Sequence, residues 1–368
     1  MARGRTTHQT TSQVMAVDTV RLLQTLSDAF GVTGFEDEVR EALRALVEPY
    51  ADEIRTDVLG NLLVTRRGGS GFTVMLDAHL DEIGLIINHV DEKGFLHFAT
   101  LGGWDTRILP AEAVTVRTRE GGKVRGVIGS LPPHILKSEE RDKPIPVDSL
   151  FIDVGASSAE HAAGLGIRVG DPVVPGHPFE VVREGWLLGK AFDDRAGCAV
   201  LVKVLEELAG TTPEATLVMN FAVSEETGLR GARTAAFQID PQVALAVEAT
   251  VAADLPGVAP PRQPTGVGKG AAITIADAPS IVSQRMVRAL ETLAQRHEIR
   301  HQLKVPFFGG GTDAGAIQTS RAGVLAGIVS IPVRYIHSPV SLMWLDDFDQ
   351  VVRLVTAFAR EAKTLFTP

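Results

Sequence analysis

Two adjacent aspartates, Asp193 and Asp194, lie where a predicted loop leads into an apolar helical pattern. One acidic residue at a helix start has a structural explanation, because its side chain can cap free backbone N–H groups and its charge suits the positive end of the helix. The second aspartate is not needed for that purpose. It is therefore a candidate for chemistry, together with other ligand-type side chains that follow predicted strands.

A His-x-Asp pair, His79 and Asp81, follows one of these strands. Residues two apart on a strand face the same way, so the aspartate can hydrogen-bond one imidazole nitrogen and direct the other toward a metal. Taken alone, such a pair is more often a core histidine beside a surface carboxylate.

Carboxylates and a second histidine follow three further strands. Glu225 and Glu226 are adjacent, so one can bind a metal while the other faces a substrate; a solvated charged loop explains them equally well. Glu248 ends the apolar run from Ala244, where the alternative is a charge that reaches water. His337 follows a strand, and alone it is better explained as a structural histidine.

Five of these side chains form a set of imidazole and oxygen donors: His79, Asp193, Glu226, Glu248 and His337. The set suits zinc, cobalt or manganese, and a thiolate site is excluded because Cys198 is the only cysteine. Two histidines and three carboxylates fit two metal ions about 3.5–4 Å apart that share one carboxylate and hold a water. Glu225 would take a proton from that water and pass it to the leaving group.

The elements that must position these residues alternate between helix and strand. Such alternation predicts a sheet with helices on both faces, and ligands bind such sheets at the carboxyl ends of the strands. The periodicity predicts helices over residues 19–30, 37–50, 281–297 and 346–365, and strands over 72–77, 215–223, 243–248 and 323–331.

Residues 85–175 have a different character, with short β-like runs separated by glycine and proline. This pattern predicts a small β-barrel or sandwich. We therefore expect an α/β domain in two pieces, residues 19–84 and 176–368, with a β domain inserted between them. Residues 1–18 lack a signal-peptide core and are expected to be a disordered lead-in.

The composition excludes several classes of protein. The 368 residues carry a net charge of −9 and only 5% aromatic residues, which argues against a nucleic-acid partner. No run reaches the roughly 18 apolar residues of a membrane span. A single cysteine rules out an intramolecular disulfide and fits a reducing cytoplasm.

Five motifs occur in one order: HLDEIG at 79–84, GKAFDDR at 189–195, SEETG at 224–228, GTDA at 311–314 and YIHSP at 335–339. In this order they resemble the tetrahedral aminopeptidases, a family of dinuclear metallopeptidases that includes glutamyl aminopeptidases and proteins once labelled cellulases. The resemblance covers nearly the whole chain after residue 20. It implies a zinc-aminopeptidase-like α/β fold, an inserted PDZ-like or barrel-like dimerisation domain, and a homo-oligomer that is often a dodecamer built from dimers.

The resemblance also implies a role for each site residue. His79 and Glu248 would be the terminal ligands of one metal, Glu226 and His337 those of the other, and Asp193 the bridge. Glu225 would be the general base, and Asp81 would orient His79. The substrate pocket would lie near Gly310, Gly311, Thr312 and Asp313.

Further expectations concern the aspartate pair and one departure from the family. The peptide bond between Asp193 and Asp194 is expected to be cis, with Asp194 as the helix cap and Arg195 neutralising part of the local charge. The family usually has aspartate where this chain has Glu248, which adds one methylene to the reach; Asp254 is the alternative ligand.

The expected function is a metal-dependent aminopeptidase that acts on short peptides through two metal ions. Zinc and cobalt are the first candidates for these ions, and manganese is a further candidate. A related amidohydrolase or deacylase acting on a blocked or specialised substrate would need the same metal centre. A non-catalytic assembly protein is disfavoured because Glu225 is present, and glycoside hydrolysis does not require the histidines.

Overall fold

The computed structural model describes residues 18–132, 134–137, 143 and 145–367. Most of the predicted lead-in, residues 1–17, lies outside the described residues. Asp18, its last residue, caps α1 (Thr19–Asp28), because its carboxylate accepts hydrogen bonds from the backbone N–H groups of Val20 and Arg21 at 2.9 and 3.2 Å.

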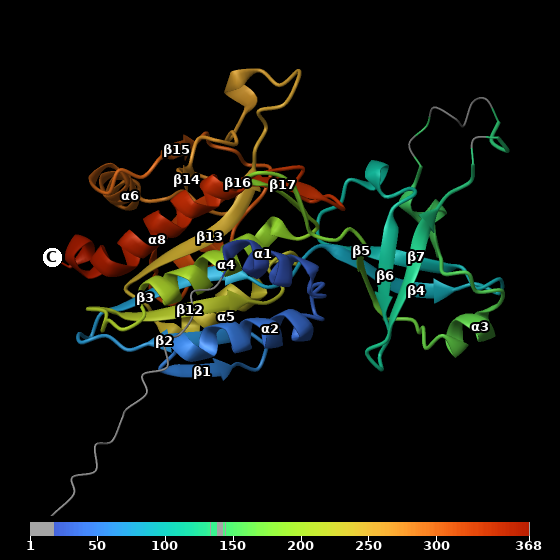
Figure 1. Ribbon diagram of the computed structural model, residues 1–368, viewed down its shortest axis with the longest axis horizontal. Helices are drawn as coiled ribbons and strands as arrows, with labels where there is room; N and C mark the ends of the chain where they lie inside the picture. The colour runs from blue at the N-terminus through green and yellow to red at the C-terminus, as the bar shows by residue number, and fades with distance from the viewer. Residues whose placement is uncertain (1–17, 133, 138–142, 144, 368) are drawn as a thin grey trace, which may run out of the picture.

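The larger lobe is built on one sheet of eleven strands (Figure 1). Its centre is four neighbouring parallel strands, in the order β12, β3, β13, β16. These four are almost entirely buried, which explains their continuous apolar sequences. The strands of the sheet are β1 (Glu53–Thr56), β2 (Leu62–Arg66), β3 (Thr73–His79), β10 (Glu180–Arg183), β11 (Trp186–Gly189), β12 (Thr216–Ala222), β13 (Val243–Val251), β14 (Ala271–Thr274), β15 (His301–Lys304), β16 (Leu325–Arg334) and β17 (Ser341–Trp344).

Helices cover both faces of this sheet. On one face α4 (Phe192–Glu207) packs across β3 and β13 and is flanked by α1 and α8 (Leu345–Phe366). On the other face α5 (Arg230–Ile239) packs on β12 and α7 (Ala314–Gln318) on β13 and β16. The remaining helices of this lobe are α2 (Asp37–Val47), α6 (Gln284–Arg296) and the 3-10 turns η1 (Glu48–Tyr50) and η5 (Pro260–Arg262).

The smaller lobe is a closed barrel with its own apolar core, which includes Leu85, Phe98, Val116 and Ile152. In Figure 1 it lies to the side of the sheet lobe. Its strands, in order around the barrel, are β4 (Gly84–Val90), β5 (Leu96–Leu101), β8 (Phe151–Asp153), β7 (Lys123–Gly129), β6 (Ala113–Arg117) and β9 (Pro172–Pro175). Between these strands lie η2 (Thr106–Ile108), η4 (Val147–Ser149) and α3 (Ala159–Gly164).

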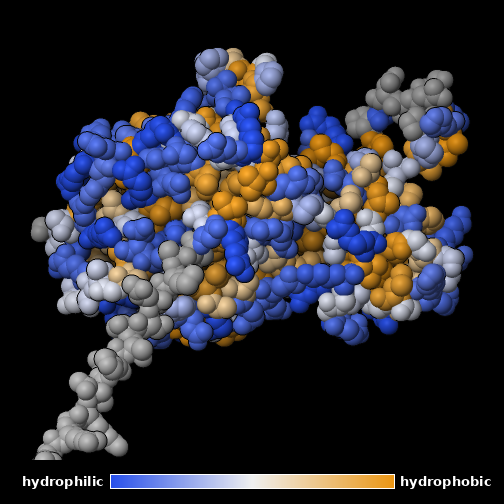
Figure 2. Space-filling view, in the orientation of Figure 1, coloured by the Kyte–Doolittle hydropathy of each residue, from blue (hydrophilic) through white to orange (hydrophobic). Residues whose placement is uncertain are grey.

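The predicted fold class, a sheet covered by helices on both faces with a separate small β unit, is confirmed. The predicted end of one strand is wrong. β13 continues past Glu248 to Val251, because β16 pairs with it along its whole length. Among the described residues, no helix combines the length and apolar character that a membrane crossing requires. Figure 2 shows a largely polar surface, with apolar side chains gathered near the middle of the view and on the barrel.

Candidate metal centre

A cavity of about 890 Å³ opens at the carboxyl edge of the central strands, the edge at which open α/β sheets bind ligands. His79 is the last residue of β3, and Glu248 lies near the end of β13. Glu225 and Glu226 follow β12, and His337 follows β16. Asp193, from the first turn of α4, also lines this cavity, so the five predicted metal ligands and the predicted base meet there.

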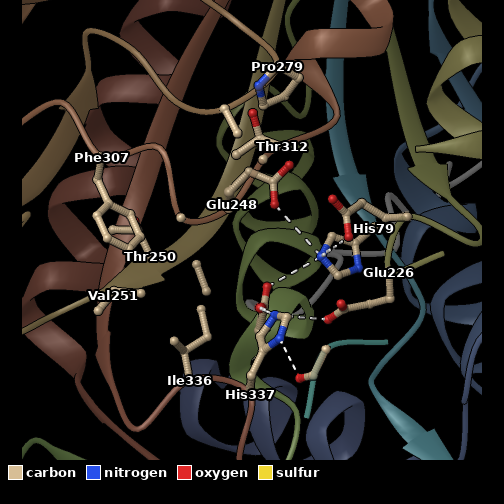
Figure 3. Close-up of a pocket in the computed structure, with 18 of the residues that line it drawn as sticks. His79, Glu226, Glu248, Thr250, Val251, Pro279, Phe307, Thr312, Ile336 and His337 are labelled. Atoms are coloured by element: carbon tan, nitrogen blue, oxygen red, sulfur yellow. Dashed lines mark hydrogen bonds and ion pairs between the residues drawn. The ribbon is translucent and has the colours of Figure 1, made fainter. Parts of the chain in front are cut away.

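The imidazole rings of His79 and His337 point toward the same part of the cavity (Figure 3). Asp193 lies between them, with its Oδ1 3.3 Å from Nε2 of His79 and its Oδ2 3.1 Å from Nε2 of His337. One carboxylate oxygen thus faces each imidazole. This is the arrangement that a carboxylate shared by two metal ions requires.

The other predicted carboxylate ligands lie one beside each histidine. Oε2 of Glu248 is 3.7 Å from Nε2 of His79, and Oε1 of Glu226 is 3.3 Å from Nε2 of His337. In the described part of the chain, two groups of side chains bring ligand atoms close enough to hold an ion: His79, Asp193 and Glu226, and His79, Asp194 and Glu248. All five predicted ligands therefore converge on one place.

Glu248, rather than the alternative Asp254, reaches this place. Its carboxylate is buried, and its Oε1 accepts a hydrogen bond from the backbone N–H of Asp313 at 3.1 Å. Asp254 instead forms a two-point ion pair with Arg334, at 2.6 and 3.1 Å. The extra methylene of glutamate does not keep residue 248 from the cluster.

Asp81 contacts His79 less directly than predicted. Nδ1 of His79 is 3.0 Å from the backbone carbonyl oxygen of Asp81 and 3.5 Å from its carboxylate. That carboxylate accepts closer hydrogen bonds from the backbone N–H groups of Glu225 and Glu226, at 2.9 and 3.1 Å. Asp81 thus holds the loop after β12 as well as the imidazole.

The aspartate pair has the predicted backbone geometry, since the peptide bond between Asp193 and Asp194 is cis. Asp194 caps the regular part of α4 by accepting a hydrogen bond from the backbone N–H of Gly197 at 3.1 Å. The prediction for Arg195 is wrong. Its side chain is fully buried and pairs with Glu82 at 3.2 Å and with backbone carbonyl groups, not with the aspartates.

The charges of the cluster fit a cation-binding site. Burial raises the pKa of Glu225 to about 8 and that of Glu226 to about 7, because several carboxylates share a space with little water. Burial opposes ionisation of Asp193 as well, but hydrogen bonds from His337 and His79 hold the pKa of its carboxyl well below the usual range. Imidazole and carboxylate donors are those that zinc, cobalt and manganese accept, so the residues present fit divalent metal ions.

The predicted substrate residues divide into two groups. Gly310, Gly311 and Thr312 line the cavity. Asp313 does not, and its side chain is fully buried. The substrate role expected for Asp313 is therefore not supported by its position.

Several contacts of the site had no signal in the sequence. The backbone carbonyl oxygen of Gly103, in the loop after barrel strand β5, accepts a hydrogen bond from Nδ1 of His337 at 2.9 Å. Lys304, at the end of β15, lines the cavity. Thr33 donates a hydrogen bond to Asp81 at 2.6 Å, and Glu36 accepts one from the backbone N–H of Ser224 at 3.2 Å.

Comparison with known proteins places this geometry in a family. Residues 60–354 match the M42 glutamyl aminopeptidase family. The chain is also similar to the lysyl aminopeptidase of Pyrococcus furiosus. The two are 34% identical over 358 residues, which cover 94% of this chain and 99% of that protein.

Solved structures show the same fold. The TET aminopeptidase of a marine sediment archaeon of the Thaumarchaeota superposes with a TM-score of 0.90 at 40% identity, over 93% of this chain and 96% of that one. The Pyrococcus horikoshii TET1 peptidase, which can assemble into a tetrahedron or a large octahedral shell, superposes with a TM-score of 0.84 at 32% identity, over 94% and 100% of the two chains.

Proposed function

The chain belongs to the M42 glutamyl aminopeptidase family, and on that premise we propose how its cavity cleaves peptides. It is a metal-dependent aminopeptidase, a hydrolase that releases N-terminal residues from peptides. The observation that carries the proposal is the position of Asp193 between His79 and His337, with Glu225 at the edge of the same cluster.

We propose that each subunit binds two divalent metal ions. Zinc and cobalt are the first candidates, and manganese is a further candidate. His79 and Glu248 would hold one ion, Glu226 and His337 the other, and Asp193 would bind both. Metal ions bound there would polarise the scissile carbonyl group and lower the pKa of a water molecule toward neutrality.

Glu225 is the proposed general base. Its carboxylate lines the cavity without lying between the two histidines, and its Oε2 is 3.8 Å from Nε2 of His79. It would take a proton from the attacking water and deliver it to the amine that leaves when the peptide bond breaks. A buried glutamate that lines the cavity beside the metal ligands is placed to accept a proton and to return it.

Metal removal combined with one substitution tests this assignment. A chelator should abolish release of amino acids from unblocked peptides, and zinc, cobalt or manganese should restore it. Glu225→Gln should lower kcat by about 10²–10⁴-fold while metal content stays at the wild-type level. Full activity of a metal-free sample, or of Glu225→Gln, would remove the basis of the mechanism.

The names of similar proteins do not decide which N-terminal residue of the substrate is preferred. The family is named as glutamyl aminopeptidase, whereas one relative is a lysyl aminopeptidase. We propose a preference for acidic N-terminal residues on the basis of Lys304. Away from the metal centre, it is the one charged side chain among the described residues that line the cavity. It is only 6% exposed, and no described carboxylate lies within 4.0 Å of its ammonium group.

A buried ammonium group without a close partner favours an anionic ligand and disfavours a cationic one. Burial lowers the pKa of Lys304, and the more distant carboxylates Asp277, Glu248 and Asp193 partly oppose that shift. A glutamyl or aspartyl side chain in the cavity would supply the missing counter-charge. A lysyl side chain would place two ammonium groups together.

Aminoacyl substrates test this preference. Lys304→Met should lower kcat/KM for a glutamyl substrate by about 10–100-fold and leave a leucyl substrate nearly unchanged. Lys363→Met on α8, which removes a lysine that pairs with Glu214 on the surface, is the matched control. A wild-type enzyme that prefers lysyl substrates would contradict the preference and leave the peptidase function intact.

The alternative function, an amidohydrolase acting on a blocked or specialised peptide, uses the same metal centre. Parallel assays on free and N-acylated peptides separate the two functions. We propose that cleavage of free peptides is faster, because similar proteins such as the lysyl aminopeptidase of Pyrococcus furiosus are named as aminopeptidases.

We also propose that the chain forms a homo-oligomer, with residues 85–175 as the dimerisation domain and a dodecamer built from dimers as the final assembly. The support is the TET1 peptidase of similar fold, which assembles into closed shells. Light scattering on the purified protein measures the subunit number. A cytoplasmic location is proposed from the single cysteine, which fits a reducing compartment.

A further inference from the structure

The loop that carries Glu225 and Glu226 is held by side chains from distant parts of the chain. It connects β12 to α5 and contains no regular structure, and Ser224 and Leu229 have left-handed backbone angles, with φ of 56° and 57°. Such angles are uncommon for residues other than glycine and persist where the surroundings impose them.

Four successive backbone N–H groups of this loop each donate to a side chain that lies elsewhere in the sequence. In order, the pairs are Val223 to Asn61 at 3.0 Å, Ser224 to Glu36 at 3.2 Å, Glu225 to Asp81 at 2.9 Å, and Glu226 to Asp81 at 3.1 Å. These four N–H groups bind side chains instead of the carbonyl groups of a neighbouring strand. The direction of the Glu225 side chain therefore depends on Asn61, Glu36 and Asp81.

Two members of this arrangement come from the segment between α1 and α2. Glu36 also accepts a hydrogen bond from the backbone N–H of Gly34 at 2.8 Å, which fixes its own carboxylate. Thr33 donates its hydroxyl hydrogen bond to Asp81 at 2.6 Å, which fixes that carboxylate in turn. Both side chains are buried, at 8% exposed for Thr33 and 5% for Glu36, and neither lines the cavity.

We propose that Thr33 and Glu36 are positioning residues that hold the Glu225 loop in its working conformation, a role that rests on the proposed peptidase function. Glu36 acts on the loop directly through the backbone of Ser224. Thr33 acts through Asp81, which binds the next two N–H groups. Neither side chain touches the donor atoms of the proposed metal ligands. Because Glu226 follows Glu225 in the same loop, the effect on the base has to be measured at saturating metal.

A buried carboxyl group at position 36 is better explained by its hydrogen bond to the Glu225 loop than by packing alone. Burial and the charge of Asp81 both raise the pKa of its carboxyl, and an apolar side chain would avoid that cost. What a carboxylate offers here is an acceptor for the N–H of Ser224, whose left-handed backbone would otherwise leave a buried donor unpaired.

Two pairs of substitutions test the proposal in the metal-loaded enzyme. Glu36→Ala and Thr33→Val remove the acceptor and the donor, and each should lower kcat at saturating metal by about 10–100-fold with KM nearly unchanged, since a shift of about 1 Å in a catalytic group has that effect. Glu36→Gln and Thr33→Ser keep an acceptor oxygen and a hydroxyl group, and should retain most of the activity.

Glu38→Ala is the matched control. Glu38 lies in the first turn of α2 and also accepts a backbone hydrogen bond, from Phe30 at 3.0 Å, but it has no contact with the Glu225 loop. General loosening of the α1–α2 connection would therefore lower activity in Glu38→Ala as well. A kcat loss confined to Glu36→Ala and Thr33→Val supports positioning.

Amide hydrogen exchange gives a readout independent of turnover. The amide protons of residues 224–226 should exchange faster in Glu36→Ala than in the wild type or in Glu38→Ala. Unchanged exchange and unchanged kcat in Glu36→Ala would overturn the proposal, as would equal losses in Glu36→Ala and Glu38→Ala. A wild type that fails to hydrolyse unblocked peptides would contradict the proposed function, and the exchange result would still decide whether Glu36 holds the loop.

Discussion

The two sides of the metal centre are built differently. His79 and Glu248 lie on strands of the parallel sheet and are almost inaccessible to solvent, at 1% and 3% exposed. Glu226 and His337 lie on loops, and the His337 side chain is 39% exposed. We refer to His79 and Glu248 as the sheet side and to Glu225, Glu226 and His337 as the loop side.

The contacts that hold the two sides also differ. The backbone ladders of β3 and β13 and the packing of α4 fix the sheet side. The loop side has left-handed residues at Ser224, Tyr335 and His337, and depends on hydrogen bonds to single groups such as the carbonyl oxygen of Gly103. The sheet side should therefore tolerate distant substitutions, whereas the loop side should respond to them.

The largest effect is expected where the two sides meet, at Asp193. Asp193→Asn keeps the size of the side chain, removes its charge and replaces one of its two oxygens with an NH2 group, which cannot bind a cation. Because its two oxygens face His79 and His337, both proposed metal positions should lose affinity, and activity should fall by more than about 100-fold.

Metal analysis and peptide assays on Asp193→Asn check this expectation. Asp105→Asn, which changes an exposed aspartate paired with Arg107, is the control. Retention of one ion at wild-type affinity would show that Asp193 serves only one side of the centre.

The same division explains what the sequence could predict. The apolar runs of β3, β12 and β16 predict strands because they are buried on both faces, and the five motifs identify the family, which the comparisons confirm. Ligand-type side chains beside a helix start and after predicted strands also led to the five donor residues, which the structure brings together. Short edge strands such as β1 and β10 were missed because their residues are largely exposed.

Contacts between distant segments could not be predicted. Glu36 and Ser224 are 188 positions apart, and nothing in either segment indicates the other. Arg195 was assigned to the neighbouring aspartates because they are adjacent in sequence. In the structure, the first turn of α4 directs it toward the connection after α1, where Glu82 and carbonyl groups bind it.

An intermediate loss of activity is expected from Gly102→Ala. Gly102 lies in the loop after barrel strand β5, next to the loop side of the metal centre. Gly102 has φ of 79°, and an added Cβ would lie 2.6 Å from Cγ2 of Ile83 and 3.3 Å from Oε2 of Glu226. The clash should displace Glu226, lower kcat by about tenfold and cost about 1 kcal/mol or more of stability.

Gly121→Ala separates backbone strain from pressure on the site. Gly121 has a similar φ of 85°, but an added Cβ would have no neighbour within 4 Å. Its stability should fall without a matching loss of kcat. The kcat of Gly102→Ala and Gly121→Ala is measured on protein that circular dichroism shows to be folded. Equal kcat values would mean that the added Cβ at residue 102 does not displace Glu226.

The smallest effect is expected at Asp254, the acidic residue near the sheet side that pairs with Arg334 and that we propose is not a metal ligand. Burial raises its pKa, but the hydrogen bonds and charge of Arg334 outweigh this, so the pKa is lowered overall. A carboxyl group whose pKa is lower in the folded than in the unfolded protein stabilises the fold at pH values above its unfolded-state pKa. That contribution is lost as the pH falls through its folded-state pKa. Asp254→Asn should therefore lower Tm by roughly 1–2 °C at pH 7, and the difference should shrink below about pH 3.8.

Metal content and kcat should be unchanged in Asp254→Asn, whereas Glu248→Gln should lower both. The two residues are six positions apart, and sequence alone leaves either one as the ligand. In the structure Arg334 occupies both carboxylate oxygens of Asp254, while Glu248 faces His79. A loss of metal in Asp254→Asn equal to that in Glu248→Gln would mean that the ion pair opens when metal binds, and that the sheet side of the centre is not fixed by its strands alone.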